Sequence, residues 1–434
     1  MKKIRYYFKK ALELIVCRIK SGTFSVLLAN VLNKAVGMMS TMIVTRIVST
    51  NDYGVWTYTL NMYSYLLLIS GFGLAAGAMQ FGAENIGNGR ANSFFKYCLK
   101  TGVIIDLFII SFFGVIMINA VIPIPRAKCY IIAILPMLIV EYILSIAQAM
   151  LRSQNRIHEF AICLNVNAVL ITLGNCIGAY IGLNGLLIGR YVANILSLVL
   201  ILYYFQRQYR ETINADVLER SEKKDLWKYS LYTGASSAMN ILVYSLDITL
   251  IAYLIKNERE VAIYRIGTLI PTALSFIPNS ILVAILPTII YHRADFDWIK
   301  NVIRKLIFAL FGCNALVCLL FFIYAPFVLT VFAGSKYIPS VPILRILILG
   351  YLVSGTFGTI SINILASLRR VKYGLLISVL SCVLDISLNY FLIMKMGSVG
   401  AAFATLLVHI IVAVMSMSYL LYLIRKRTLT ELCT

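Results

Sequence analysis

Long apolar windows, separated by short polar breaks, dominate the chain. Because about 20 apolar residues cross the hydrocarbon core of a bilayer, these windows predict membrane-spanning helices. We expect twelve of them, near residues 23–46, 54–82, 101–122, 129–151, 160–181, 185–205, 229–255, 263–290, 306–333, 341–366, 373–394 and 400–424. The tight GLNG turn at 182–185 predicts a hairpin of the fifth and sixth helices.

Composition agrees with this pattern. The 434 residues are 60% hydrophobic and 13% charged, whereas soluble domains are about 45–50% apolar and about 25% charged. The chain is therefore predicted to be an all-α polytopic membrane protein. Its nine cysteines are odd in number and form no C-x-x-C motif, so they favour neither a disulfide framework nor a metal centre.

The distribution of basic residues predicts the orientation of the chain. With both termini in the cytoplasm, most of the 39 lysines and arginines fall in cytoplasmic segments and few in the outer loops. This bias accounts for most of the net charge of +21. Because the basic residues are spread over short inner loops, we expect no nucleic-acid partner.

The longest connection, residues 206–228, lies halfway along the chain and mixes six basic with five acidic residues. It is typical of a solvated linker between two halves. The predicted organisation is a cytoplasmic basic amphipathic segment (1–22), an N-lobe with spans one to six (23–205), a cytoplasmic linker (206–228), a C-lobe with spans seven to twelve (229–424) and a cytoplasmic tail (425–434).

The two halves repeat a pattern. Residues 149–189 and 366–404 both carry Leu-Arg after a small residue, then a polar turn, an apolar helix and a G-x-x-G hairpin. Two six-helix repeats in the same orientation are related about an axis along the membrane normal. We therefore expect two pseudo-symmetric bundles around a central cavity, an arrangement suited to alternating access.

Several stretches resemble one family of exporters. They are TRIVSTNDYGVWTYT (45–59), SGFGLAAGAMQFGAEN (70–85), LDITLIAYLI with VAIYRIGTLI (246–270), ILVAILP (281–287) and GSVGAAFATL (397–406). In order and spacing they resemble the polysaccharide transporters of the multidrug/oligosaccharidyl-lipid/polysaccharide exporter (MOP) superfamily, and Wzx-type O-antigen flippases in particular. The resemblance covers about residues 20–424.

This resemblance implies a function in lipopolysaccharide or related polysaccharide biosynthesis. The substrate would be an undecaprenyl-pyrophosphate-linked oligosaccharide, flipped from the inner to the outer leaflet of the bacterial cytoplasmic membrane. Membrane lipids and other polysaccharide-assembly membrane proteins would be partners. The family uses no cofactor, and its transport would be coupled to H⁺ or Na⁺.

Lys34 lies near the middle of the first span, where a charge costs a few kcal/mol. Asn30 and Thr41 follow the same helical face, so we expect this face to line the cavity. There Lys34 would bind the pyrophosphate. The alternative is that Lys34 chiefly neutralises an acid such as Asp247.

Three acids also lie inside spans. Glu141 and Asp385 are near mid-span, and Asp247 is in the outer third of the seventh span. Polar residues continue their helical faces, namely Gln148 after Glu141, and Asn240 and Tyr244 before Asp247. These acids either couple transport to an ion or neutralise bases that line the cavity.

Three arginines lie about one turn inside the outer ends of their spans: Arg190, Arg265 and Arg345. They either extend to the membrane surface or form a basic outer vestibule for the substrate. The vestibule is favoured at Arg265, because its helical face continues through Thr268, Thr272 and Ser275 to Asn279.

Other functions are less well supported. The chain has no Walker A motif, and its DFD sequence at 295–297 lies in a short inner loop without a nucleotide-binding domain. We expect no catalytic residue, no metal site and no enzyme activity. The first alternative is a multidrug cation antiporter of the same superfamily. A membrane polysaccharide polymerase or ligase ranks lower, because such enzymes carry a large periplasmic loop.

Overall fold

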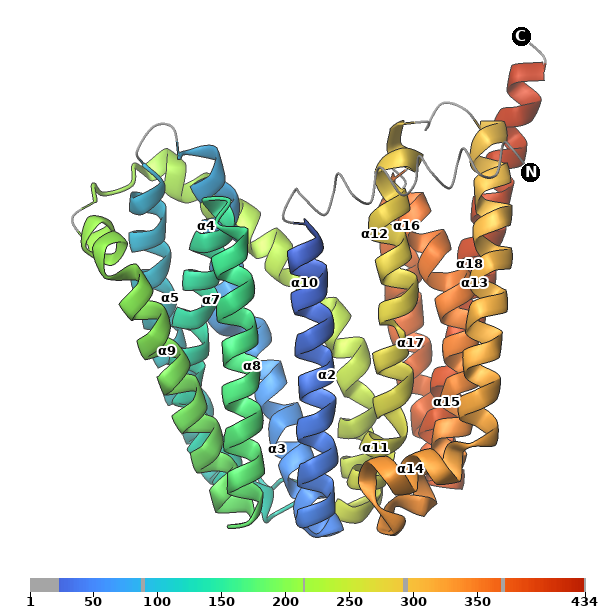
Figure 1. Ribbon diagram of the computed structural model, residues 1–434, viewed down its shortest axis with the longest axis horizontal. Helices are drawn as coiled ribbons and strands as arrows, with labels where there is room; N and C mark the ends of the chain where they lie inside the picture. The colour runs from blue at the N-terminus through green and yellow to red at the C-terminus, as the bar shows by residue number, and fades with distance from the viewer. Residues whose placement is uncertain (1–22, 87–89, 214, 292–295, 368–370, 433–434) are drawn as a thin grey trace. The chain divides into compact units, whose positions relative to one another are not determined.

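The computed structural model describes residues 23–86, 90–213, 215–291, 296–367 and 371–432 (Figure 1). All regular structure in these ranges is helical. The chain divides into two compact units. Unit 1 comprises Met1–Val48 and Thr59–Tyr244, and unit 2 comprises Ser49–Tyr58 and Ser245–Thr434.

Unit 1 contains the first helices of the chain and parts of two that continue into unit 2. They are α2 (Thr23–Ile47), α3 (Thr50–Ile69), the short η1 (Ser70–Gly73), α4 (Leu74–Glu84), α5 (Ala91–Asn119), α6 (Ala127–Ile134), α7 (Met137–Ser153), α8 (Ile157–Ala179), α9 (Leu183–Ile213) and α10 (Arg220–Ile255). The start of α3 and the end of α10 belong to unit 2.

Unit 2 is built from the remaining helices. They are α11 (Glu258–Leu274), α12 (Phe276–Tyr291), α13 (Phe296–Ile323), α14 (Ala325–Ala333), η2 (Ser335–Ser340), α15 (Val341–Val353), the π-helical turn η3 (Ser354–Gly358), α16 (Thr359–Ser367), α17 (Val371–Met396) and α18 (Ser398–Leu432).

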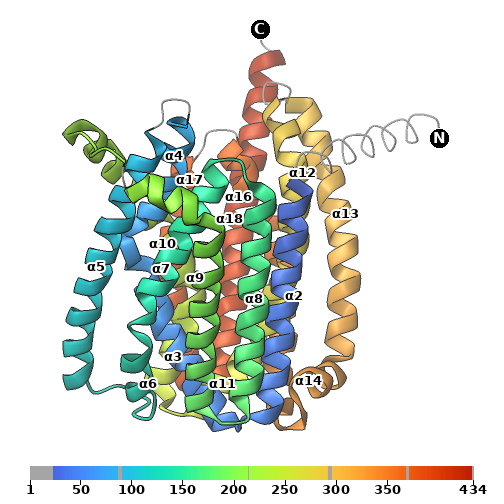
Figure 2. The ribbon, with the colours of Figure 1, turned by 60° about the vertical axis from the view of Figure 1, so that its left-hand side comes forward.

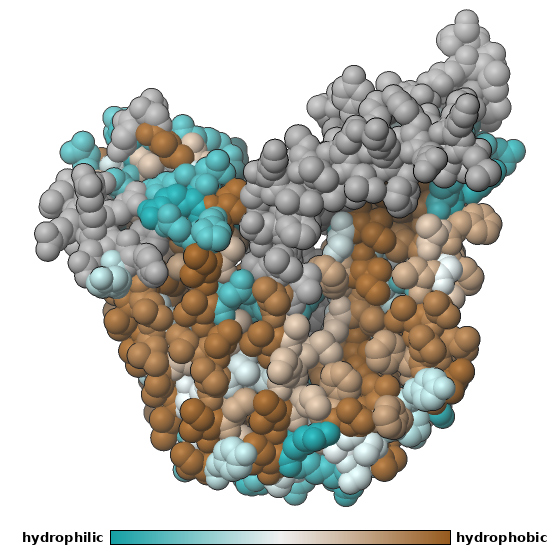
Figure 3. Space-filling model, in the orientation of Figure 1, coloured by the Kyte–Doolittle hydropathy of each residue, from teal (hydrophilic) through white to brown (hydrophobic). Residues whose placement is uncertain are grey.

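The prediction of an all-α polytopic membrane protein is confirmed. Within the described ranges, nine helices are long and apolar enough to cross a membrane, or ten if the bent pair of α6 and α7 counts as one span. Apolar side chains cover the flanks of the helices, and hydrophilic ones gather toward their ends (Figure 3). The number of twelve spans, and the lobe boundaries drawn from the sequence, stay predictions.

Glycines set the packing of α8 and α9, which lie side by side, with α2 on the other side of α8 (Figure 2). A Cβ at Gly174 would lie 2.3 Å from the carbonyl oxygen of Gly189, so the two backbones touch. Gly182, in the turn that joins these helices, has φ +87°, which an L side chain rarely adopts. The GLNG hairpin predicted from the sequence is therefore present.

Between α3 and α4 the helix is broken. Gly71, Phe72 and Gly73 all have positive φ angles, of 53°, 46° and 78°. The buried carboxylate of Asp106 on α5 accepts hydrogen bonds from Ser70 Oγ (2.9 Å) and from the backbone N–H of Gly71 (3.0 Å). Since backbone groups freed inside a membrane need partners, Asp106 stabilises the break.

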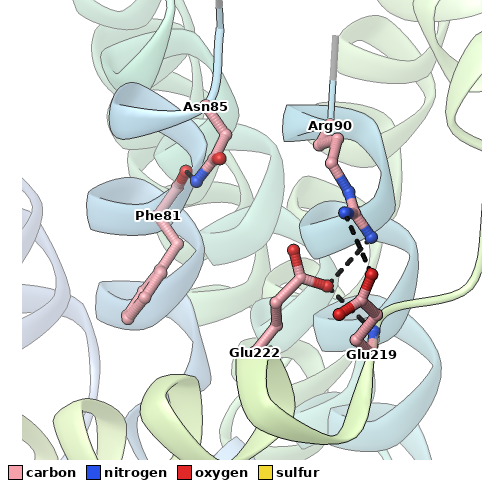
Figure 4. A network of polar contacts seen from close by, with 5 residues as sticks. All are labelled: Phe81, Asn85, Arg90, Glu219 and Glu222. Carbon is pink, nitrogen blue, oxygen red and sulfur yellow. Dashed lines mark hydrogen bonds and ion pairs between the residues drawn. The ribbon is translucent and has the colours of Figure 1, made fainter. Parts of the chain in front are cut away.

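The segment predicted as a linker contains much helix, because α9 runs to Ile213 and α10 begins at Arg220. Its charged residues hold it to α5 within unit 1. Arg90 bridges Glu219 (3.6 Å) and Glu222 (3.0 Å), as Figure 4 shows. Lys96 Nζ donates to the carbonyl of Ala215 (2.9 Å). The first turns of α10 are thus part of the packed structure of unit 1.

Candidate functional site

Unit 2 buries a carboxylate inside a set of hydrogen bonds from three helices. Asp247, on α10, is 7% exposed. Its carboxylate accepts hydrogen bonds from Tyr264 Oη on α11, from Asn389 Nδ2 on α17 (2.9 Å) and from Thr405 Oγ1 on α18 (3.0 Å). Together with Asp385 these residues form what we call the acidic cluster.

The helices bring these side chains together for local reasons. Asp385 and Asn389 are four residues apart on α17, so they share a helical face. Close packing of α17 and α18 supplies Thr405, because Gly400 lies so near α17 that a Cβ there would be 2.0 Å from the carbonyl oxygen of Leu392. This contact belongs to the second G-x-x-G hairpin.

The acidic cluster has more hydrogen-bond acceptors than donors. Asp385 Oδ2 and Asn389 Oδ1 are buried and have no hydrogen-bond partner among the described residues. The two residues are 3% and 0% exposed. No ion pair within the described ranges involves Asp247 or Asp385. Oxygen acceptors without donors fit a proton or a hard cation such as Na⁺.

Unit 1 contains a half-buried ion pair. Arg190 Nη2, on α9, lies 3.1 Å from Glu141 Oε1 on α7, and each side chain is 18% exposed. The guanidinium also lies 5.9 Å from the centre of the Tyr63 ring. Arg190 Nε is buried and makes no hydrogen bond with a described residue, and the Tyr63 hydroxyl is buried beside Glu141. We call Arg190, Glu141 and Tyr63 the arginine site.

A third polar feature is a face of α11 and α12 in unit 2 (the polar face). Arg265 is exposed at its start, and four side chains follow it at helical spacing. Each donates to a carbonyl about one turn back: Thr268 to Arg265 (2.8 Å), Thr272 to Thr268 (2.7 Å), Ser275 to Thr272 (2.6 Å) and Asn279 to Ser275 (2.8 Å).

The opposite face of α11 is buried and apolar. Ile266, Gly267 and Ile270 lie there, and a Cβ at Gly267 would be 2.4 Å from the Ile343 side chain of α15. The helix is thus fixed in rotation, with Arg265 and its hydroxyl neighbours turned outward. An exposed polar face on an otherwise apolar span is typical of a helix that lines a water-filled path.

Arg345, on α15, differs from the other two arginines. Its Nε donates to the carbonyl of Phe322 (3.1 Å), near the C-terminal end of α13, and its guanidinium lies 5.2 Å from the centre of the Phe322 ring. A cation at a helix C-terminus satisfies orphan carbonyls and the helix dipole. These contacts give Arg345 a structural role at this helix end.

The remaining predicted residues are described to different extents. Lys34 is exposed on α2, and Gln148 is half-buried on α7. Thr41, one turn after Gly37 on α2, donates to the carbonyl of Gly37 (3.0 Å). The side chains of Asn30, Asn240 and Tyr244 lie outside the described residues. The sequence left open a pairing of Lys34 with Asp247. The hydrogen-bond donors described around Asp247 are three neutral side chains of unit 2, those of Tyr264, Asn389 and Thr405.

Sequence reasoning did not assign Tyr63 or Thr405 to a site. Neither residue differs in sequence from the many hydroxyl residues of these spans. Asn389 had a signal, since it follows Asp385 by four residues.

Comparison with known proteins identifies relatives by family and by fold. Residues 19–291, more than half of the chain, match the family described as polysaccharide biosynthesis protein. No curated protein matches the chain by sequence.

Among solved structures, an inward-facing multidrug resistance MATE family transporter of the MOP superfamily aligns with a TM-score of 0.75 at 13% identity, covering 93% of this chain and 98% of that one. The lipid II flippase MurJ in an inward closed conformation aligns with a TM-score of 0.72 at 15% identity, covering 92% and 87%. A MOP superfamily transporter from Pyrococcus furiosus, described by the reverse polarity of its binding pocket, aligns with a TM-score of 0.61 at 14% identity, covering 94% and 95%. At these identities the likeness concerns the fold.

Proposed function

The chain belongs to the polysaccharide biosynthesis protein family, and from this premise we propose that it is a flippase for lipid-linked oligosaccharides. Its substrate is an undecaprenyl-pyrophosphate-linked repeat unit of O-antigen or a similar polysaccharide. It carries this substrate from the inner to the outer leaflet of the bacterial cytoplasmic membrane by alternating access. Both chain termini lie in the cytoplasm, and membrane proteins of polysaccharide assembly receive the product.

The observation that carries this proposal is the polar face of α11 and α12. A pyrophosphate cannot cross a low-dielectric slab uncompensated, because desolvating an isolated charge is very costly. Arg265 offers a cation that can bind phosphate through two parallel hydrogen bonds. The hydroxyl and amide groups from Thr268 to Asn279 already donate within their own helix, so their free lone pairs are acceptors for sugar hydroxyls.

The sign of the charge separates this function from drug export. The fold of multidrug MATE transporters is shared by this chain, so the fold does not decide between the two. A path for cationic drugs needs carboxylates on its exposed polar surface. Here the ionisable side chain on the polar face is Arg265, and Lys34 on α2 is also exposed. Cations favour an anionic substrate.

The acidic cluster supports coupling of transport to an ion. Asp247 and Asp385 are two buried carboxylates with spare acceptor oxygens beside them. A proton or a sodium ion bound there neutralises charge inside the membrane, so binding and release of the ion change the free energy of unit 2. This linkage allows an ion gradient to drive one conformation over another.

The test is transport by the purified protein reconstituted in vesicles, with a lipid-linked oligosaccharide as substrate. Accessibility of the sugar to an external glycosidase measures flipping. We expect the wild-type protein to flip the substrate and Arg265→Gln to lose about tenfold or more, since a hydrogen bond to a charged group contributes about 1.5–3 kcal/mol. The matched control is Arg304→Gln, which removes an exposed arginine of α13.

Deletion of the gene provides the test in cells. Accumulation of lipid-linked repeat units on the cytoplasmic face supports flipping. Unit-length sugar already attached on the periplasmic side would identify a polymerase instead. Unchanged surface polysaccharide together with altered dye efflux would overturn the proposal in favour of a drug antiporter.

A further inference from the structure

The arginine site of unit 1 has surplus hydrogen-bond donors. Arg190 contacts Glu141 through Nη2, while its Nε–H is buried and has no partner among the described residues. The hydroxyl of Tyr63, a residue 1% exposed, is buried beside the Glu141 carboxylate. Because a guanidinium carries five N–H donors and no acceptor, the group that completes this site must be an acceptor.

Other arginines of the same protein are more fully engaged. Arg90, at the start of α5, contacts two carboxylates through both of its Nη atoms. Arg345 uses Nε for the carbonyl of Phe322. Arg190 is more buried than Arg90, since its side chain is 18% exposed against 37% for Arg90. An ion pair that served stability alone would gain from a second hydrogen bond at such a site.

The unpaired edge of Arg190, at Nε, matches the geometry of a phosphate. Two phosphate oxygens can accept from Nε and from one Nη in the parallel arrangement that planar guanidinium groups favour. The Tyr63 hydroxyl adds a donor next to the same guanidinium, whose carbon lies 5.9 Å from the centre of the Tyr63 ring. A carboxylate held by one oxygen is a weaker ligand than a phosphate held by two.

We propose that Glu141 is an internal substitute for the phosphate of the substrate at Arg190. In the empty protein the Glu141 carboxylate neutralises the buried guanidinium. When the lipid-linked oligosaccharide enters, a pyrophosphate oxygen pair takes the Nε–Nη edge of Arg190, accepts a hydrogen bond from Tyr63 and displaces Glu141. The inference rests on the proposed function for the identity of the anion, and it assigns Glu141 the role of a competitor.

If Glu141 competes with the anion for Arg190, removing the charge of Glu141 strengthens anion binding. If Glu141 only stabilises the structure, removing its charge does not strengthen it. With Glu141→Gln the side chain keeps its size and loses its charge, so the anion no longer displaces a carboxylate. The purified full-length protein is titrated with inorganic pyrophosphate, and affinity is measured by calorimetry. We expect the dissociation constant to fall by about tenfold in Glu141→Gln, as when a competing charge-assisted contact of about 1.5 kcal/mol is removed.

Two further variants complete the experiment. Glu222→Gln removes a carboxylate from the Arg90 pair of the same unit, and we expect it to leave pyrophosphate affinity unchanged. The double variant Glu141→Gln with Arg190→Gln leaves no buried charge, so it separates loss of binding from loss of folding. We expect it to fold, as judged by thermal unfolding, and to lose the tight pyrophosphate binding of the single variant.

These measurements distinguish a Glu141 that competes with the anion from a Glu141 that only stabilises Arg190. Unchanged or weaker pyrophosphate binding in Glu141→Gln would overturn the inference, as would tight binding that survives in the double variant. Binding of pyrophosphate is measured without transport. Tighter binding in Glu141→Gln by a protein that flips no oligosaccharide would therefore leave the inference standing and contradict the proposed function alone.

Discussion

The arginine site of unit 1 and the acidic cluster of unit 2 have opposite hydrogen-bonding needs. The arginine site has an unpaired donor, at Arg190 Nε, whereas the acidic cluster has unpaired acceptors, at Asp385 Oδ2 and Asn389 Oδ1. A donor surplus selects an anion, and an acceptor surplus selects a proton or a cation. The two clusters thus differ in the charge of the ligand that would complete each of them.

The same difference in charge is found in one helix–helix contact of each unit. Helices α2 and α8 of unit 1 meet through Asn175 Nδ2 and Ser40 Oγ at 3.1 Å. The α10–α17 pair of unit 2 meets through Asn389 Nδ2 and a carboxylate oxygen of Asp247 at 2.9 Å. An amide is common to both contacts, and its acceptor is a neutral hydroxyl in one and a carboxylate in the other. One side chain determines whether this contact carries charge.

The largest expected effect follows from removing that charge. Asp247→Asn should slow ion-driven oligosaccharide flipping by about 10- to 100-fold, because charge-assisted hydrogen bonds contribute about 1.5–3 kcal/mol each. The measurement is flipping in vesicles under an imposed Na⁺ or H⁺ gradient. Asp225→Asn, which neutralises an exposed carboxylate of the same helix, is the control. Full gradient-driven flipping in Asp247→Asn would show that the carboxylate is not the coupling group.

The converse change introduces charge into unit 1. Ser40 is 6% exposed, and Ser40→Asp places a carboxylate there next to the Asn175 amide. We expect the protein to lose about 2–4 kcal/mol of stability, since a buried charge without a counter-ion is costly. Thermal unfolding in detergent measures the loss, with Ser40→Ala as the uncharged control. An unchanged unfolding temperature in Ser40→Asp would show that unit 1 tolerates a carboxylate at this helix contact, as unit 2 does at Asp247.

A smaller effect is expected from one donor of the acidic cluster. Thr405→Val removes the hydroxyl that donates to Asp247 at 3.0 Å and keeps the shape of the side chain. A neutral hydrogen bond contributes about 0.5–1.5 kcal/mol, so the ion concentration that gives half-maximal flipping should shift by about 2- to 10-fold. Thr330→Val, on α14, where the hydroxyl bonds its own helix, should leave this concentration unchanged. Equal shifts in both variants would rule out a specific role for Thr405.

Much of the fold could be predicted from the sequence, because membrane-spanning helices have a distinctive apolar composition. The apolar windows predicted helices throughout, and GLNG predicted a hairpin that Gly182 and the Gly174–Gly189 contact form. The helical spacing from Arg265 to Asn279 also predicted a shared face, which continues from α11 into α12 across Ser275. The break at Ser70–Gly73 was not foreseen, because it depends on the carboxylate of Asp106 from another helix.

The candidate sites were accessible only in part. Buried acids and bases such as Asp247, Glu141 and Arg190 attract notice by their cost inside a span. Their partners do not, because a threonine or tyrosine is tolerated at many positions of a membrane helix. Thr405 and Tyr63 become distinct only when tertiary packing brings them to a charge. For the same reason the sequence could not separate Arg345, which bonds a helix end, from Arg190, which pairs with an acid.

The division of α3 and α10 between the units has a consequence for synthesis of the protein. Leu218 and Leu226 lie in the hydrophobic core of unit 1, so this core cannot close until the ribosome has passed the middle of the chain. Conversely, Tyr53 is made early and packs edge-on against Tyr337, with ring centres 6.2 Å apart, inside unit 2. Unit 1 therefore needs residues from beyond the midpoint of the chain, and unit 2 uses residues made near its beginning. A chain halted between the two halves would leave both cores incomplete, which favours keeping the halves on one polypeptide.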